Sequence, residues 1–204
     1  MASTSQKSTI LPGRSASHGL AATMLPNPDG GKPGLVFREM AHLGKLNLRA
    51  DKSAGKIVKS ITGCMFPPAA NKFTTAGERH AAWLGPDEFM IICEAGKDEE
   101  LASAIHASFD GRHATVTNVT DALTAFHLKG AAVRQVLAKG CALDLHHDSF
   151  TSGDVAQTLL SHAAIIIMAL ADHELIVTCR TSFASYLHDW LCDAALEYGF
   201  QFNK

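Results

Sequence analysis

The chain has 204 residues, of which 47% are hydrophobic, and 18 Lys and Arg against 20 Asp and Glu give a formal net charge of -2. This length fits one domain or two small subdomains that share a core, and the apolar content excludes disorder along the whole chain. The near balance of charge argues against a nucleic-acid-binding protein, which carries a clustered basic surplus. The longest apolar run, at 163–171, is far shorter than the roughly 20 residues that span a bilayer, so we predict no membrane segment.

The N-terminal segment and the cysteines indicate where the protein resides. Residues 1–34 hold four of the seven prolines and show no continuous apolar stretch typical of a secretory signal. The five cysteines form no C-x-x-C pair, which favours free thiols in a reducing cytoplasm. We expect 1–34 to be a flexible arm, either disordered or docked onto a partner, and we favour this over a transit peptide.

From Leu35 onward the apolar residues become regularly spaced. Gly44 separates two loosely alternating segments, which predicts a pair of strands, and Gly63 is placed to end a helix that Asp51 or Ser53 caps. The first half, 35–111, is therefore predicted to contain strands at 35–43 and 46–48, a helix at 51–62, a hairpin of strands 79–84 and 88–93, and a helix at 97–110.

The second half, 112–204, repeats this plan. Strands are predicted at 113–119 and 123–128, followed by a helix at 130–139, strands at 155–160, 163–170 and 174–180, and a helix at 182–198. Residues 84–93 also align with residues 170–179, with identical Leu, Glu and Cys and apolar residues between them. The sequence thus predicts an α+β fold of two related ββ-α-ββ-α halves, whose antiparallel sheets are covered by helices.

One cluster has the composition of a metal site. His146, His147 and Asp148 are consecutive, but adjacent histidines in a strand point to opposite faces, and the local spacing of a zinc site is missing. We interpret this cluster as a solvated loop and expect no metal site.

The remaining catalytic patterns are equally weak. His188 and Asp189, with Ser182 or Ser185, suggest a hydrolytic triad, but all lie on one predicted helix and no G-x-S-x-G elbow is present. Glycine-rich nucleotide motifs are also missing. We therefore expect this chain to contain no catalytic residue and to bind no cofactor.

Cysteines and aromatic residues suggest packing and contact roles. Cys93 and Cys179 lie in apolar strands and are interpreted as inert core residues, whereas Cys141 follows a helix and could be a reactive thiol. Trp83 and Tyr186 are candidate subunit-interface residues, because aromatic side chains concentrate binding energy at the centres of interfaces.

Four segments together carry a family resemblance. The chain resembles the gamma subunits of bacterial heterotetrameric sarcosine oxidases over roughly residues 35–200. The resemblance rests on LGPDEF at 84–89, LAKGCALDLH at 137–146, F-x-x-G-x-V-A-Q-T-L-L at 150–160 and CRTSFASYLHDWLCDAA at 179–195. It implies a fold similar to the folate-binding aminomethyltransferases, the T-proteins of glycine cleavage.

The resemblance also implies a function. Such complexes oxidatively demethylate sarcosine to glycine, and the methyl carbon goes to tetrahydrofolate or leaves as formaldehyde. FAD, FMN and NAD belong to the assembly, and the gamma chain is an accessory partner of the alpha, beta and delta subunits. We therefore expect a cytoplasmic, non-catalytic subunit that binds neither nucleic acid nor membrane.

Three other functions stay open at this point, and one of them is a structural scaffold that binds an unrelated enzyme. The gamma-type subunits of other N-methyl amino acid dehydrogenases, such as that of N-methylglutamate, are similar to this chain. A stand-alone folate-binding transferase would need a carboxylate for the pterin ring, and no candidate ranks above the others among Asp87, Glu88, Asp144 and Glu174.

Overall fold

The computed structural model describes residues 13–109 and 111–204. Its strands are β1 (Thr23–Leu25), β2 (Leu35–Glu39), β3 (Gly44–Arg49), β4 (Phe73–Ala76), β5 (Arg79–Gly85), β6 (Glu88–Cys93), β7 (Thr115–Asn118), β8 (Leu123–Lys129), β9 (Val155–Leu160), β10 (Ala163–Ala171), β11 (Glu174–Arg180) and β12 (Phe200–Asn203). Its α-helices are α1 (Gly55–Thr62), α2 (Asp98–Ser108), α3 (Val133–Ala138) and α4 (Ala184–Ala194), with 3-10 turns at Lys52–Ala54 and Thr181–Phe183.

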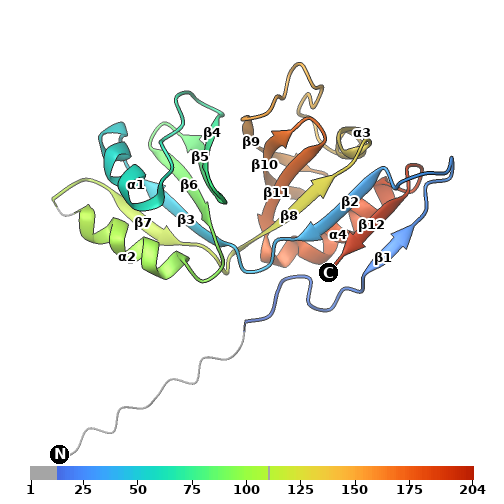
Figure 1. The fold of residues 1–204 in the computed structure, drawn as a ribbon, viewed down its shortest axis with the longest axis horizontal. Coiled ribbons are helices and arrows are strands. Elements are labelled where there is room, and N and C mark those ends of the chain that lie inside the picture. Colours follow the sequence, from blue (N-terminus) through green and yellow to red (C-terminus); the bar gives the residue numbers. More distant parts are fainter. Residues whose placement is uncertain (1–12, 110) are drawn as a thin grey trace, which may run out of the picture.

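The strands form two sheets that face each other (Figure 1). The larger sheet has the order β1-β12-β2-β8-β11-β10-β9, and the smaller has the order β4-β5-β6-β3-β7. All neighbours are antiparallel except β12 and β2. The predicted α+β class with helix-covered antiparallel sheets is confirmed.

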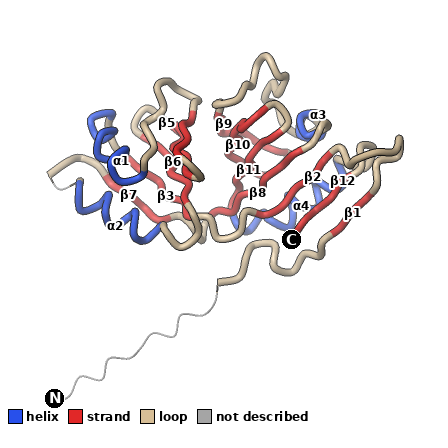
Figure 2. The backbone as a smooth tube through the Cα atoms, in the orientation of Figure 1, coloured by secondary structure: helices blue, strands red, loops and turns tan. Residues whose placement is uncertain are grey.

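Helices cover the outer faces of the two sheets, as the blue and red segments of Figure 2 show. Side chains of β6 alternate between the two sides: Phe89 and Ile91 pack in the core under α1 and α2, whereas Met90 and Ile92 pack in the core between the sheets. A strand that is buried on both faces requires a continuous apolar run rather than an alternating one. This explains why strands such as β6 and β10 are apolar along their length.

The internal repeat is visible in the two hairpins. The register of β5 and β6 shifts between Trp83 and Gly85, and the register of β10 and β11 shifts between Ala169 and Ala171. Each shift therefore lies at a leucine, Leu84 in the first hairpin and Leu170 in the second. The alignment of residues 84–93 with residues 170–179 pairs these two leucines. A β-bulge is a defined backbone feature, and its recurrence at matched positions shows that the two halves share one plan.

Each half contributes its first strand to the sheet of the other half. β2 pairs with β8 in the larger sheet, and β7 pairs with β3 in the smaller sheet. The two strands predicted at 35–43 and 46–48 are present as β2 and β3, but the predicted turn at Gly44 is wrong, because the chain turns at Ala41 and His42, where it crosses between the sheets. The division into units 35–111 and 112–204 stays a prediction.

Helix ends follow the local sequence. Gly63, at φ 80°, ends α1 and donates its N–H to Lys59, and the Asp51 side chain accepts from the N–H of Ser53 at 2.7 Å. The C-terminal helix ends earlier than predicted, at Ala194, and β12 follows Gly199. No helix among the described residues has the length and apolar character needed to cross a bilayer.

The described part of the predicted arm is attached to the body. β1 pairs with β12, and Ser17 is buried against Glu39. Residues 1–12 of the predicted arm lie outside the described residues. The role of the arm stays a prediction.

Candidate functional site

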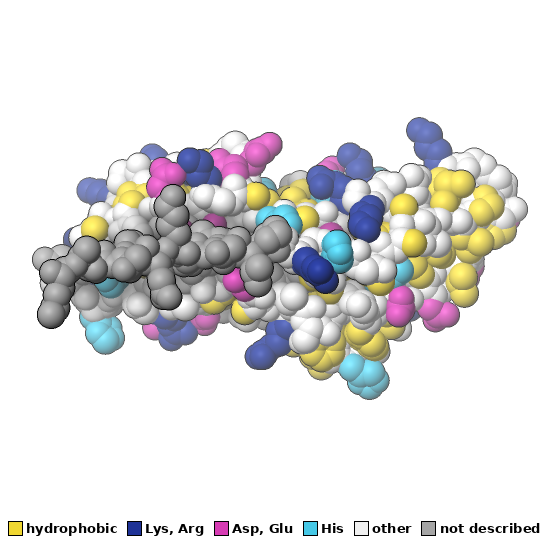
Figure 3. Space-filling model, turned by 90° about the horizontal axis from the view of Figure 1, so that it is seen from below, with side chains coloured by type: hydrophobic (Ala, Val, Ile, Leu, Met, Phe, Trp, Pro, Cys, Tyr) yellow, Lys and Arg dark blue, Asp and Glu magenta, His cyan; other side chains and the backbone are white. Residues whose placement is uncertain are grey.

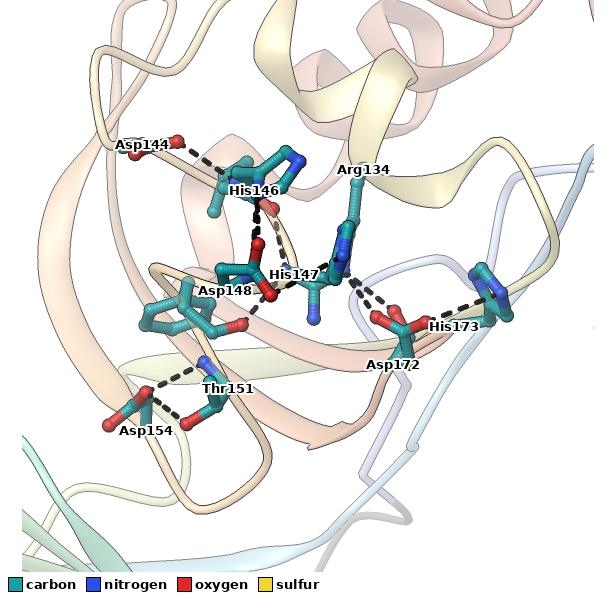
Figure 4. Close-up of polar contacts among 11 residues, drawn as sticks. Arg134, Asp144, His146, His147, Asp148, Thr151, Asp154, Asp172 and His173 are labelled. Carbon is teal, nitrogen blue, oxygen red and sulfur yellow. Dashed lines mark hydrogen bonds and ion pairs between the residues drawn. The ribbon is translucent and has the colours of Figure 1, made fainter.

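A cavity of about 570 Å³ opens beside α3, in the larger-sheet half of the molecule. Its lining combines apolar side chains with histidines, carboxylates and one arginine, and Figure 4 shows these polar side chains on three segments of the chain. The three segments are α3, the loop at 141–150 and the turn at 171–173. The lining side chains are Ala131, Arg134, Gln135, Ala138, Cys141, Leu143, Asp144, Leu145, His146, His147, Asp172 and His173.

Arg134, on α3, ties the cavity walls together. Its Nη1 donates to the carbonyl oxygens of Leu145 at 2.6 Å and Phe150 at 2.9 Å, and its Nε donates to the carbonyl of Asp172 at 2.7 Å. The Asp172 carboxylate lies 3.4 Å from Nε. A guanidinium has several donors in fixed directions, so one side chain can hold both the loop and the turn in place.

The histidine cluster lies in a turn of that loop and not in a strand. The rings of His146 and His147 are consequently on the same side, with centroids 4.1 Å apart. Asp148 lies between them, with one oxygen 3.5 Å from Nδ1 of His146 and the other 3.4 Å from Nε2 of His147. The expectation that the two histidines diverge is wrong, because it assumed an extended backbone.

Asp144 supports the turn from its N-terminal side. Its carboxylate accepts a hydrogen bond from the N–H of His146 at 3.0 Å. A hydrogen bond from Ser149 and the bond from the His146 backbone lower the pKa of Asp144, so it is ionised at neutral pH. Of the four carboxylates weighed for a pterin ring, this one lines the cavity.

The other three carboxylates bind basic side chains elsewhere. Asp87 and Glu88 pair with Arg49 at 3.0 and 2.9 Å. Glu174 accepts from His127 at 2.7 Å. Burial would raise the pKa of Glu174, but its hydrogen bonds from His127 and Lys129 lower the pKa overall. The structure therefore does not gather the candidate carboxylates into one site.

The residues that suggested a hydrolytic triad in the sequence do not form a nucleophilic site. His188 is buried among aromatic rings, 4.6 Å from Phe202 and 5.8 Å from Phe37 between centroids. Its Nδ1 lies 2.9 Å from the carboxylate of the adjacent Asp189. Ser185 is exposed on α4. The histidine is therefore part of the core between α4 and the larger sheet.

The two candidate interface residues lie in different layers. Trp83 is half-buried on the helix-facing side of the smaller sheet. Tyr186 is half-buried on α4, and its hydroxyl donates to Oγ of Ser161 at 2.9 Å, in the turn between β9 and β10. The structure does not bring them together, and their role as contact residues stays a prediction.

A buried charge network was not predicted from the sequence. The Glu39 carboxylate is 8% exposed and accepts hydrogen bonds from the arm, at Ala16 and Ser17, and from the Thr124 hydroxyl. Lys45 is 2% exposed and donates its Nζ to the carbonyl of Leu43 at 2.7 Å. The only signal in the sequence was a charged residue inside each of two short apolar segments.

Burial and the neighbouring polar groups act in opposite directions on the pKa values of Glu39 and Lys45. Burial would raise the pKa of Glu39, but the hydrogen bonds from Ser17, Thr124 and Ala16 lower the pKa overall. Burial lowers the pKa of Lys45, and the charge of Glu39 opposes that shift.

A second cavity, of about 470 Å³, lies where the arm crosses the body. Arg14, His18, His42 and Lys204 line it together with Glu39. Lys, Arg and His side chains are also grouped near the middle of the face that Figure 3 shows. Arg14 and Lys204 place two basic side chains in the same cavity as the buried Glu39 carboxylate.

The chain was compared with known proteins. It matches the family described as sarcosine oxidase, gamma subunit family, over residues 49–197. It is 29% identical over 188 residues to the sarcosine oxidase subunit gamma of an Arthrobacter species, and 27% identical to that of Corynebacterium sp. strain P-1. Each of these alignments covers 91% of both chains.

Solved structures show the same fold. A chain of the heterotetrameric sarcosine oxidase from Corynebacterium sp. U-96, in complex with pyrrole 2-carboxylate, superposes with a TM-score of 0.80 at 24% identity. That match covers 91% of this chain and 95% of the other. The glycine cleavage aminomethyltransferase T from Bartonella henselae superposes with a TM-score of 0.63 at 11% identity, covering 91% of this chain and 56% of that chain.

The fold predicted from the resemblance, similar to the T-protein, is confirmed by these superpositions. The match to the family over most of the chain confirms the resemblance itself, and with it the interpretation as an accessory subunit of a sarcosine oxidase, an oxidoreductase. The chain belongs to the sarcosine oxidase gamma subunit family.

Proposed function

We propose that this chain assembles with alpha, beta and delta subunits into a cytoplasmic, flavin-dependent sarcosine oxidase that demethylates sarcosine to glycine. The observation that carries the proposal is the family match over residues 49–197. The agreement in fold along nearly the whole length of a chain from a heterotetrameric sarcosine oxidase supports it. In this proposal the methyl carbon passes to tetrahydrofolate or leaves as formaldehyde.

The chain itself acts as a non-catalytic subunit in this proposal. The partner subunits hold the FAD, FMN, NAD and tetrahydrofolate of the complex and supply the amine-oxidising site. The contacts of the candidate catalytic histidine and of two candidate pterin-binding carboxylates support this division of roles. His188 is packed in the core, and Arg49 pairs with both Asp87 and Glu88.

Tyr186 and Trp83 are proposed to contact the partner subunits. Tyr186 lies beside the β9–β10 turn, and Leu159 on the neighbouring edge strand β9 leaves 56% of its surface exposed. Half-buried aromatic side chains such as that of Tyr186 are enriched at the centres of contact surfaces. Tyr186→Ala should therefore weaken assembly, whereas Ser108→Ala, at an exposed position on the outer helix α2, is the matched control.

Co-expression of the four subunits, with and without this chain, tests the proposal. Size-exclusion chromatography gives the assembly, the visible absorbance gives the flavin content, and sarcosine-dependent turnover gives the activity. We expect a yellow, sarcosine-active heterotetramer whose assembly requires this chain. Faster turnover of N-methylglutamate than of sarcosine would assign the complex to that related class. A colourless monomer that binds tetrahydrofolate by itself would overturn the proposal.

A further inference from the structure

Three metal-ligating side chains converge in the turn at 146–148. One ligand atom from each of His146, His147 and Asp148 lies within 4.8 Å of the other two. The two carboxylate oxygens of Asp148 each lie near a different imidazole, at 3.5 and 3.4 Å. Two imidazole nitrogens and a carboxylate oxygen form a donor set that suits first-row transition metals such as zinc and copper.

The backbone of this turn is held in place before any ion binds. The His146 carbonyl accepts from the N–H groups of Ser149 and Phe150, both at 2.9 Å. Arg134 binds the carbonyls of Leu145 and Phe150, on either side of the turn. A pre-organised loop loses little conformational freedom when it binds a ligand, so more of the interaction energy appears as affinity.

The charges around the turn favour a cation. The turn and the cavity lining together carry three carboxylates, those of Asp144, Asp148 and Asp172, and one guanidinium, that of Arg134. The Arg134 guanidinium is 11% exposed; its Nε and Nη1 donate to backbone carbonyls and Nε lies 3.4 Å from the Asp172 carboxylate, whereas its buried Nη2 has no hydrogen-bond partner among the described residues. Negative charge therefore remains in excess on the rim when the histidines are neutral.

We propose that His146, His147 and Asp148 form a binding site for one divalent transition-metal cation of the zinc class at the rim of the cavity. The ion would replace the long hydrogen bond, of 3.3 Å, that Nδ1 of His146 accepts from the N–H of Asp148. Both histidines also line the cavity, so a ligand in the cavity can reach the remaining coordination positions. This inference does not depend on the proposed function.

Calorimetric titration of the untagged full-length chain with Zn²⁺ at pH 7.5 tests the site. We expect one ion per chain, and we expect His147→Ala and Asp148→Asn each to weaken binding at least about tenfold, because even indirect supports of a metal site are worth that much. Cu²⁺ titration followed by electron paramagnetic resonance should show coupling to two imidazole nitrogens in the original chain and to one in His146→Ala. These three residues are exposed, so their replacement should leave the fold intact.

His173→Ala is the matched control, because His173 is an exposed histidine on the same rim that lies 3.6 Å from the carboxylate of Asp172. Its Zn²⁺ affinity should equal that of the original chain. Two results would overturn the proposal: the lack of saturable binding, or equal affinities for the original chain, His146→Ala and His147→Ala. Subunit assembly is measured separately in the co-expression experiment, so a failure of the metal site leaves the proposed function untouched.

Discussion

Ser17 donates both its backbone N–H and its hydroxyl to the buried carboxylate of Glu39, so a residue of the N-terminal segment is fastened to the end of strand β2. The N–H of Ala16 binds the other oxygen of the same carboxylate at 3.0 Å. Hydrogen bonds to a charged acceptor contribute more than neutral ones. This single side chain is therefore a main attachment point for the described part of the arm.

Replacing Glu39 by glutamine should loosen the arm. The amide lacks the charge and one of the two acceptor oxygens, so donors of Ala16, Ser17 or Thr124 lose a partner, and we expect a loss of about 1–3 kcal/mol in the free energy of unfolding. Urea denaturation measures this loss, and hydrogen exchange at residues 13–20 should increase. An unchanged exchange rate in this segment would contradict the attachment.

The same carboxylate makes stability depend on pH with a defined sign. Because the pKa of Glu39 is lower in the folded state, its contribution is fully present above the unfolded pKa, near 4.5, and is lost as the pH falls through the folded pKa. The difference in unfolding free energy between the original chain and Glu39→Gln should therefore be largest at neutral pH and shrink in acid. Urea titrations at several pH values test this, and a difference that grows in acid would contradict it.

Gly130 cannot tolerate a side chain. Its φ is 140°, and a Cβ there would overlap the carbonyl oxygen of Gly34, which is backbone and cannot rotate away. We expect Gly130→Ala to lower the free energy of unfolding by more than about 3 kcal/mol. Gly96→Ala is the matched control, because Gly96 also has a positive φ, 74°, but its Cβ would meet open space. Thermal denaturation should show a cost of about 1 kcal/mol there.

Arg134 should control the order of the cavity loop. Arg134→Met keeps the apolar stem but leaves the carbonyls of Leu145, Phe150 and Asp172 without their donor, at an expected cost of about 1–3 kcal/mol. Hydrogen exchange in 141–150 should rise in this variant. Arg134→Lys should recover only part of the protection, because an ammonium lacks the fixed directions of the guanidinium. Full recovery of the protection in Arg134→Lys would contradict this, because it would show that a positive charge alone is enough to order the loop.

The thiols of the core should be slow to react. Burial raises the pKa of Cys93 to about 11 and that of Cys179 to about 12. Burial also raises the pKa of Cys192 to about 11. Because the thiolate is the reactive form, these three cysteines should resist a disulfide reagent at pH 8 in the native protein and react after unfolding in guanidinium. Mass mapping of early adducts checks this, and rapid labelling of Cys179 would contradict it.

Much of the local structure could be predicted from the sequence. The apolar runs of β6 and β11, the Gly63 end of α1 and the matching hairpins at 84–93 and 170–179 depend on residues close together in the chain. Strand β12 was missed, because its four residues alternate too briefly to indicate a strand. The family resemblance was likewise carried by contiguous motifs.

The candidate site could be predicted only in part. The sequence determined that His146, His147 and Asp148 are adjacent, but their convergence depends on a turn that Arg134 holds through the carbonyls of Leu145 and Phe150. Side-chain direction follows backbone conformation. Every residue has a backbone carbonyl, so the residue types do not indicate which carbonyls accept a hydrogen bond from a side chain.

The sequence by itself determined the order of the helices and of the strands other than β1, β4 and β12, the internal repeat and the family. Only the tertiary structure decided that β2 and β7 exchange sheets, that Glu39 is buried by the arm and that Trp83 and Tyr186 lie in different layers. The physical reason is the range of the interactions. Periodicity and turns depend on residues that are close together in the chain. Thr124 and Glu39, in contrast, are 85 positions apart, and only the packing of the complete fold brings the Thr124 hydroxyl to the Glu39 carboxylate.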